Sequence, residues 1–297
     1  MSFDSLAAKI KALASPTVAG LDPKIEYVPS FLVEQAKKQF GDTPAATGEA
    51  LRLFNKGLID ALCDVVPAVK PQSAYYELYG KAGQDALAWT IAYAKSKGMY
   101  VILDVKRGDI GATSEAYAGA YLAGGDYSSD CITVNPYLGS DGVLPFVDMA
   151  KANDRAIFAL VKTSNKSSGE FQDVLTEGGA PLYRRVADKV VEWGADNVTA
   201  CGYSRVGAVV GATYPAHLAE LRKVMPQTFF LIPAYGAQGG TAQDLKSAFA
   251  ADGSGAVVNS SRAIMCAYMK KGTPETFADA ARAEAVAMRD AIAAVLS

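Results

Sequence analysis

The 297-residue sequence has very few of the residues that carry the commonest forms of catalysis and metal binding. Its single histidine, His217, cannot build a His-rich metal site, and a serine- or cysteine-based triad would depend on that one residue. The four cysteines, Cys63, Cys131, Cys201 and Cys266, form no C-x-x-C pair and are predicted to be buried thiols in a reducing compartment. Any catalysis is therefore expected to rely on lysine, aspartate and backbone groups.

The sequence also lacks a strong net charge and a long apolar run. Lys and Arg number 29 against 31 Asp and Glu, and no basic cluster indicates nucleic-acid binding. No apolar run reaches the roughly 18 residues of a membrane span, and the N-terminus is typical of a short amphipathic helix, over about residues 3–14. We therefore expect a cytoplasmic protein with no nucleic-acid and no membrane partner.

What the sequence does contain is a regular alternation of strand and helix patterns. Eight short runs rich in β-branched residues and bounded by turn residues are predicted as strands. Between them lie amphipathic helical patterns, in which Leu51, Phe54, Leu58, Ile59 and Leu62 share one face. The predicted strands are 17–22, 66–70, 100–106, 131–135, 157–163, 207–213, 228–233 and 256–260.

Alternating strands and helices require parallel strands, and eight of them favour a closed barrel. Such barrels take roughly 250 residues as one unit, and no linker or charge block divides this chain. We therefore predict a single (β/α)8 (TIM) barrel domain over residues 1–297, with the N-terminal helix preceding strand 1. The alternative is a Rossmann-like sheet, but Gly20-Leu21-Asp22-Pro23 does not match the G-x-G-x-x-G turn that it needs.

Polar residues collect at the predicted C-terminal strand ends, where a barrel carries its active site. Asp104 and Lys106 are two apart in the third strand and therefore project to the same face, the lumen. Because a lone buried charge is costly, they are expected to need each other, with Lys70 as a further partner. A structural ion pair is the alternative, but Lys70 and the nearby Asp109 favour function. The other polar strand ends carry Asp22, Lys162, Ser164, Asn259 and Arg262.

The loops after strands 7 and 8 predict a phosphate site, since these loops commonly hold phosphate in barrels. They read Pro233-Ala234-Tyr235-Gly236-Ala237-Gln238-Gly239-Gly240 and Asn259-Ser260-Ser261-Arg262. The glycines let backbone N–H groups approach an anion, Gln238 offers an amide donor and Arg262 a bidentate fork. Either loop alone is typical of a flexible surface loop, but the two together favour a phosphate-binding site.

Residues 104–113, Asp-Val-Lys-Arg-Gly-Asp-Ile-Gly-Ala-Thr, resemble the D-x-K-x-x-D-I-x-x-T signature of the orotidine 5'-monophosphate decarboxylase family. Residues 233–240 resemble the phosphate loop of that family. D-x-K-x-x-D alone is shared with sugar-phosphate decarboxylases of the same superfamily, but the resemblance continues from Asp22 to Arg262 and includes Lys162-Thr163-Ser164-Asn165. The long connections 23–65 and 165–206 resemble the longer-chain branch of the family.

The resemblance implies a homodimer that converts orotidine 5'-monophosphate (OMP) to UMP in de novo pyrimidine biosynthesis, without metal or cofactor. Lys106 would donate the proton to the C6 carbanion, with Asp104, Asp109 and Lys70 as the other catalytic residues. Asp22 and Lys70 would hold the ribose, Ser164 the pyrimidine edge, and Tyr235, Gln238 and Arg262 the phosphate, while Asp109, Ile110 and Thr113 would cross to the neighbouring site. The implied substrate-binding residues are Asp22, Ile110, Thr113, Ser164, Pro233, Tyr235, Gln238, Ser261 and Arg262.

Other functions remain open on the same residues. A related sugar-phosphate decarboxylase would need a divalent metal, and a nucleotide-binding barrel without activity would leave the Asp104 and Lys106 pair unexplained. A Schiff-base aldolase needs a neutral lysine with a depressed pKa. Lys106 lies between two aspartates in the sequence, which favours its ammonium form and therefore proton donation.

Overall fold

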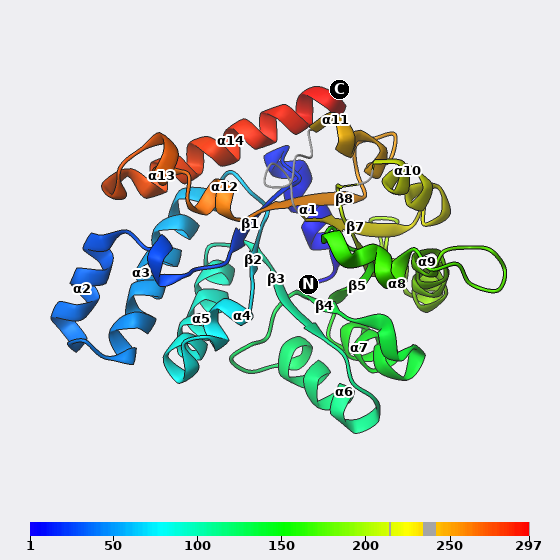
Figure 1. The fold of residues 1–297 in the computed structure, drawn as a ribbon, viewed down its shortest axis with the longest axis horizontal. Helices are drawn as coiled ribbons and strands as arrows, with labels where there is room; N and C mark the ends of the chain where they lie inside the picture. The colour runs from blue at the N-terminus through cyan, green and yellow to red at the C-terminus, as the bar shows by residue number, and fades with distance from the viewer. Residues whose placement is uncertain (214, 234–241, 297) are drawn as a thin grey trace.

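The strands close into one parallel barrel in the computed structural model, which describes residues 1–213, 215–233 and 242–296. The eighth strand pairs with the first, with Asn259 opposite Val18, so no sheet edge remains in this part of the chain. The predicted (β/α)8 barrel is therefore confirmed (Figure 1). The strands are Thr17–Leu21 (β1), Ala68–Pro71 (β2), Tyr100–Arg107 (β3), Cys131–Val134 (β4), Ala156–Lys162 (β5), Ser204–Val210 (β6), Thr228–Ile232 (β7) and Ala256–Ser260 (β8).

The helices surround the barrel on its outside, and the N-terminus lies near the centre of the ring in Figure 1. Most of them cover the strands that precede or follow them, as the strand and helix alternation requires. The α-helices in the described ranges are Phe3–Leu13 (α1), Ser30–Phe40 (α2), Pro44–Leu62 (α3), Ala74–Glu77 (α4), Gly80–Ser96 (α5), Gly111–Ala118 (α6), Ser140–Ala152 (α7), Gly169–Gln172 (α8), Leu182–Gly194 (α9), Pro215–Val224 (α10), Ala242–Leu245 (α11), Arg262–Met265 (α12), Tyr268–Lys271 (α13) and Phe277–Leu296 (α14).

The sixth strand shows the largest shift from its predicted range, since β6 covers Ser204–Val210 instead of 207–213. Its polar start satisfies its own hydrogen bonds, because Ser204 Oγ donates to the Gly194 carbonyl and Arg205 Nη1 donates to Asp154 at 2.8 Å. Gly207 lies inside the strand, where a Cβ would collide with the Phe158 ring. The glycine therefore makes room for a large core side chain and does not begin the strand.

The core has two layers, because alternate strand residues face the lumen or the helices. In β3, Tyr100 and Ile102 pack in the inner cluster, whereas Val101 and Leu103 pack in the outer cluster. The helix face predicted around Leu51 is confirmed, since all five of its apolar residues are fully buried in α3. The strands are therefore covered on both sides, as parallel sheets usually are.

Helix α1 closes the N-terminal end of the barrel. Phe3 and Leu6 are fully buried in the inner cluster. The ring of Phe3 lies 4.9 Å from the ring of Phe158 and 5.0 Å from that of Phe229, measured between centroids. Both partners stand near the first residues of their strands, so α1 covers the end of the barrel opposite to the strand C-termini.

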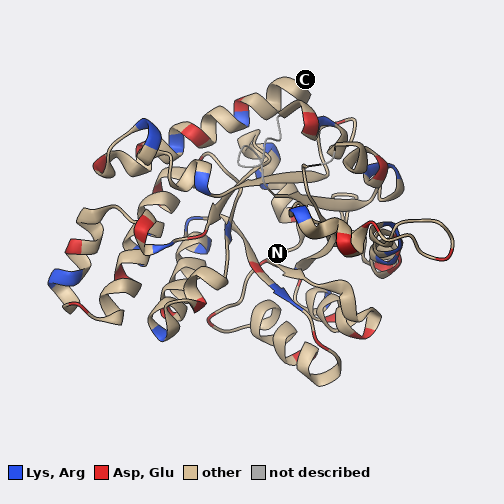
Figure 2. Cartoon of the chain, viewed as in Figure 1, with Lys and Arg blue, Asp and Glu red and all other residues tan. Residues whose placement is uncertain are grey.

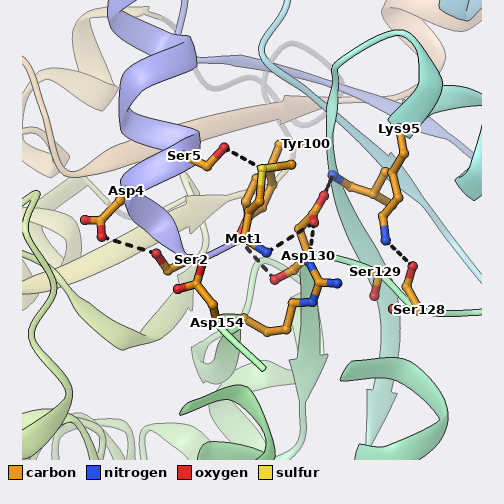
Figure 3. A network of polar contacts seen from close by, with 12 residues as sticks. Met1, Ser2, Asp4, Ser5, Lys95, Tyr100, Ser128, Ser129, Asp130 and Asp154 are labelled. Carbon is orange, nitrogen blue, oxygen red and sulfur yellow. Dashed lines mark hydrogen bonds and ion pairs between the residues drawn. The ribbon is translucent and has the colours of Figure 1, made fainter. Parts of the chain in front are cut away.

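Asp130, just before β4, is the polar centre of this closed end (Figure 3). Its Oδ2 accepts the Val101 amide at 2.9 Å, and its Oδ1 accepts Arg155 Nη1 at 2.8 Å. The Met1 ammonium group lies 3.4 Å from the same Oδ1. The buried carboxylate is thus fully hydrogen-bonded, which is the condition for keeping a charge inside a protein.

The four cysteines are free, but only one is buried. Cys131 lies inside β4, whereas Cys63, Cys201 and Cys266 are partly exposed, so the prediction of four buried thiols was wrong for three of them. The reason is position: Cys63 and Cys266 stand at the ends of α3 and α12, and Cys201 precedes β6. An apolar sequence neighbourhood does not bury a residue at an element end.

Charged residues gather on the outer helices and loops, while the barrel strands carry few of them (Figure 2). The charges that do lie on strands are confined to a small number of positions near the centre of the view. No helix within the described ranges is long and apolar enough to cross a membrane.

The closing role of α1 predicts a large loss of stability in Phe3→Ala. Removing a fully buried aromatic ring costs about 3–5 kcal/mol of unfolding free energy. Phe31→Ala in α2 is the matched control, because Phe31 is 39% exposed and should cost less than about 1 kcal/mol. Urea unfolding of both variants measures the difference, and equal losses would contradict the closing role.

Candidate active site

A cavity of about 860 Å³ opens at the C-terminal ends of the strands. It is the place where barrels carry their active sites. Polar residues from β2, β3, β4 and β8, and from the segments just after β1 and β5, surround it. The lining includes Asp22, Lys70, Gln72, Asp104, Lys106, Thr133, Asn135, Thr163, Ser164, Asn165, Gln172, Pro233, Asn259 and Ser261.

Asp104 holds two lysines at the floor of this cavity. Its Oδ2 accepts Lys70 Nζ at 2.7 Å and its Oδ1 accepts Lys106 Nζ at 2.6 Å. The side chains of Lys70 and Asp104 are only 6% and 8% exposed, whereas that of Lys106 is 46% exposed. One lysine is therefore locked inside the barrel, and the other presents its ammonium group to the cavity.

The pKa values of this cluster are moved by opposing effects. Burial by itself would raise the pKa of Asp104, but the charges of Lys70 and Lys106 outweigh it and hold that pKa well below its usual range. Burial would likewise lower the pKa of Lys70, but Asp104 and Asp22 outweigh it and raise that pKa. Both groups are therefore ionised at neutral pH.

Lys106 has an unusual backbone conformation. Its φ of 43° lies in the left-handed region, and the β3–β4 register shifts between Leu103 and Arg107. The Lys106 amide donates a 2.9 Å hydrogen bond to Thr133 Oγ1 on β4. For a non-glycine residue this conformation costs on the order of 1–3 kcal/mol, so surrounding contacts must hold it in place.

Asp22, just after β1, and Asn259, on β8, border the same cavity. In the part of the chain that the structure describes, Asp22 Oδ1 and Asn259 Oδ1 are buried without a hydrogen-bond partner. Asn259 Nδ2 donates to Ser261 Oγ at 3.3 Å. Ser261 in turn packs so closely on Gly20 that a Cβ there would collide with its side chain. The glycine of β1 thus sets the path of the chain after β8.

Only some of the predicted phosphate-binding residues lie among the residues that the structure describes. Pro233 and Ser261 line the cavity, whereas Tyr235 and Gln238 lie outside the described residues. Arg262 is exposed and begins α12, one residue beyond the lining. Ser164 lines the cavity from the loop after β5, as the sequence predicted for a polar strand end.

The second half of the D-x-K-x-x-D-I-x-x-T signature lies away from the cavity lining. Asp109, Ile110 and Thr113 follow β3 into α6 and are not among the described residues that line the cavity. Asp109 Oδ1 accepts the amide of Ile110 at 2.8 Å, and the Ile110 side chain is 56% exposed. Within one chain the structure brings together Lys70, Asp104 and Lys106, but not Asp109.

Sequence reasoning missed three polar residues of the cavity lining, Gln72, Thr133 and Gln172, and misplaced Lys162. Thr133 contacts both Asp104 and Lys106, and Gln172 holds the Thr163 amide at 2.9 Å, yet neither lies in a recognisable motif. Lys162 is fully buried and is not a described lining residue. The β5–β6 register shifts between Leu160 and Lys162, which breaks the two-residue alternation of side chains. The ammonium group of Lys162 pairs with Asp173 beside α8.

The arrangement can supply a fixed positive charge and a proton to a bound molecule. The Lys106 ammonium group faces the cavity, and Asp104 holds it at 2.6 Å. No group of three or more His, Cys, Asp or Glu side chains that could hold a metal ion occurs in the described ranges.

A closed barrel with lysines and an aspartate at the C-terminal mouth defines the class of (β/α)8-barrel proteins with a charged site in that position. Residues 51–277 match the model of the orotidine 5'-phosphate decarboxylase / HUMPS family, and the chain belongs to this family. An orotidine 5'-phosphate decarboxylase of Rhodopirellula baltica is 43% identical over 96% of both chains. One of Clostridium acetobutylicum is 42% identical over 98% of this chain and 96% of its own. The solved OMP decarboxylase of Leishmania donovani has a TM-score of 0.72 at 33% identity, covering 98% of this chain and 100% of that one.

The burial of the cluster predicts that Asp104→Asn destabilises the protein. Asn cannot neutralise Lys70, which would remain buried, and breaking a buried pair costs roughly 3–5 kcal/mol. Asp188→Asn is the matched control, since Asp188 makes an exposed pair with Arg184 that is worth about 1 kcal/mol or less. Urea unfolding near pH 7 checks both values.

The sign of the pH dependence follows from the lowered pKa of Asp104. Its stabilisation is complete above about pH 4, the pKa of an unfolded-chain aspartate, and is lost as pH falls through the lower folded-state value. The difference in free energy of unfolding between wild type and Asp104→Asn should therefore stay constant from about pH 5 to 7 and shrink below about pH 4. A gap that widens in acid would contradict this assignment.

Proposed function

We propose that this chain converts OMP to UMP and CO2, the orotidine 5'-phosphate decarboxylase step of de novo pyrimidine biosynthesis. The observation that carries the proposal is the Lys106 ammonium group, held at 2.6 Å by a buried aspartate and open to a large cavity. The family match and the names of relatives 42% and 43% identical support the same activity.

The chemistry requires a fixed charge beside the reacting carbon. When the bond from C6 to the carboxylate breaks, its electron pair remains on C6, and CO2 leaves. The Lys106 ammonium stabilises this pair and then transfers its proton to C6, which yields UMP and a neutral amine that solvent reprotonates. Asp104 positions Lys106, and Lys70 completes the array by holding the other carboxylate oxygen.

The charge state separates this reaction from a Schiff-base aldolase on the same barrel. An imine requires a neutral lysine, usually next to a cation or in an apolar pocket. Lys106 instead lies 2.6 Å from the ionised carboxylate of Asp104, a contact that suits a cationic proton donor and not an imine-forming amine. A nucleotide-binding barrel without activity would have no use for a proton donor that is strained at φ 43°.

The cavity positions suggest how OMP would lie. Asp22, just after β1, and Lys70, on β2, would hold the ribose hydroxyls, and Ser164 would meet the pyrimidine edge from the loop after β5. The phosphate would lie near Pro233 and Ser261, just after β7 and β8, where Arg262 begins α12. Tyr235 and Gln238 complete the proposed phosphate site.

We also propose a homodimer in which Asp109, Ile110 and Thr113 enter the neighbouring site. A groove of about 730 Å³ runs beside Ile110 between α6 and α7, and it is lined in part by Leu144 and Met149. Ile110 is 56% and Leu144 is 40% exposed, and exposed apolar side chains gathered on one face mark interaction surfaces. Cytoplasmic location and a reaction without metal or cofactor belong to the same proposal.

The activity predicts that purified protein releases CO2 and UMP from OMP in the presence of EDTA. Lys106→Ala should lower kcat by at least about a thousandfold, because both charge stabilisation and the proton are lost. Absorbance of the pyrimidine and product analysis measure the reaction. Activity that is abolished by EDTA and restored by a divalent metal would favour a sugar-phosphate decarboxylase instead.

The shared site predicts that two inactive variants restore each other. After Lys106→Ala and Asp109→Ala chains are mixed, half of the dimers are hybrids with one intact site each, so about one quarter of wild-type activity returns. Mixing Lys106→Ala with Asp104→Asn is the control, because both residues belong to one chain's site and nothing should return. No recovery in proven hybrid dimers of the first pair would refute the crossing of Asp109.

A further inference from the structure

Thr133 in β4 has a neutral side chain that contacts both the Asp104 carboxylate and the Lys106 backbone amide on β3. It is only 1% exposed, and its hydroxyl lies between the Asp104 carboxylate and the Lys106 backbone. It belongs to no part of the family signature and enters none of the steps described above. Its role has to be worked out from its hydrogen bonds.

The direction of both hydrogen bonds is determined by chemistry. The Lys106 amide can only donate, so Thr133 Oγ1 accepts it at 2.9 Å. The ionised Asp104 carboxylate can only accept, so the single hydroxyl proton of Thr133 goes to its Oδ1, at 2.8 Å. A threonine or serine satisfies both bonds at once, whereas an alkyl side chain satisfies neither.

These two bonds act on opposite ends of the same lysine. The first holds the backbone of Lys106 at φ 43°, which costs on the order of 1–3 kcal/mol unless contacts compensate for it. The second orients Asp104 Oδ1, the atom that holds Lys106 Nζ at 2.6 Å. Thr133 therefore ties the start and the end of the Lys106 side chain to one point on the neighbouring strand.

The same hydroxyl also keeps the two lysines apart. With Oδ1 shared between Thr133 and Lys106, the carboxylate plane leaves Oδ2 for Lys70 at 2.7 Å. If the hydroxyl bond were missing, the carboxylate could rotate about its last bond, and both ammonium groups would compete for either oxygen. The proton donor would then lose a defined position.

We propose that Thr133 is a positioning residue for the decarboxylation, which holds the Lys106 ammonium group at the place where the C6 carbanion forms. The proposal rests on the proposed function above, but its structural part does not need the reaction. Because a displacement of about 1 Å at a reacting group can cost a hundredfold in rate, a hydroxyl with this geometry should matter for turnover more than for binding.

The test compares Thr133→Val, which has the same shape without the hydroxyl, with Thr133→Ser, which keeps it. We expect Thr133→Val to lower kcat for OMP by about 10- to 100-fold with KM changed less than about threefold. Thr133→Ser should recover kcat to within about threefold of wild type. If Thr133 acted only on folding, its substitution would not lower kcat while leaving KM nearly unchanged, and serine would not restore kcat.

Thr17→Val is the matched control. Thr17 is fully buried at the start of β1, at the opposite end of the barrel, and its hydroxyl has no hydrogen-bond partner in the part of the chain described. The same chemical change there should leave kcat within about twofold of wild type. If Thr133→Val does not fold, Thr133→Ala replaces it in the comparison with serine.

A crystal structure of the hydroxyl-deficient variant separates the two proposals. If wild type does not turn over OMP, the proposed function is wrong, and the structure still shows whether Lys106 leaves φ 43° when the hydroxyl is absent. If wild type is active and Thr133→Val keeps kcat within about twofold, or if serine fails to rescue it, the positioning role is overturned.

Discussion

The carboxylate of Asp104 is buried at the mouth of the barrel, with one oxygen on Lys70 and the other on Lys106. An isolated charge at this depth would be strongly destabilising, and an isolated lysine beside it equally so. The three groups are tolerable only together, and this constraint requires β2 and β3 to be neighbours with a matched register. Lys106, which makes the outer contact of this group, has a left-handed backbone conformation.

The barrel separates this costly arrangement from the parts that hold the fold together. At the N-terminal end, α1 inserts Phe3 into the inner core, and donors surround Asp130. This end is therefore packed with side chains, and its buried carboxylate is hydrogen-bonded. At the other end the lumen is left open as a cavity, and unpaired oxygens of Asp22 and Asn259 border it in the described ranges. Stability and chemistry thus reside at opposite ends of the same strands, which allows the site to keep a strained lysine.

Much of this could be predicted from local pattern. The alternation of β-branched runs and amphipathic helices predicted the barrel, and the two-residue spacing of Asp104 and Lys106 placed them on one face. The expectation that polar strand ends surround the site failed at Lys162, because the β5–β6 register shifts there and its ammonium group pairs with Asp173. It also could not find Thr133, since a threonine in an apolar strand is ordinary in sequence and becomes informative only when its neighbours are known. The sixth strand began three residues early, because the partners of its polar residues, such as Asp154 for Arg205, come from distant segments.

By itself the sequence determined the order of the elements and the set of charged residues available at the strand ends. It also made catalysis based on histidine improbable, since there is one histidine. These features follow from composition and short-range periodicity. Only the tertiary structure decided which of those charges meet, which lysine is locked at 6% exposure and which at 46% faces the cavity, and which hydroxyl lies between them. The reason is that burial and hydrogen bonding depend on strand register and closure, which bring β2, β3 and β4 side by side although Lys70 and Thr133 are far apart along the chain.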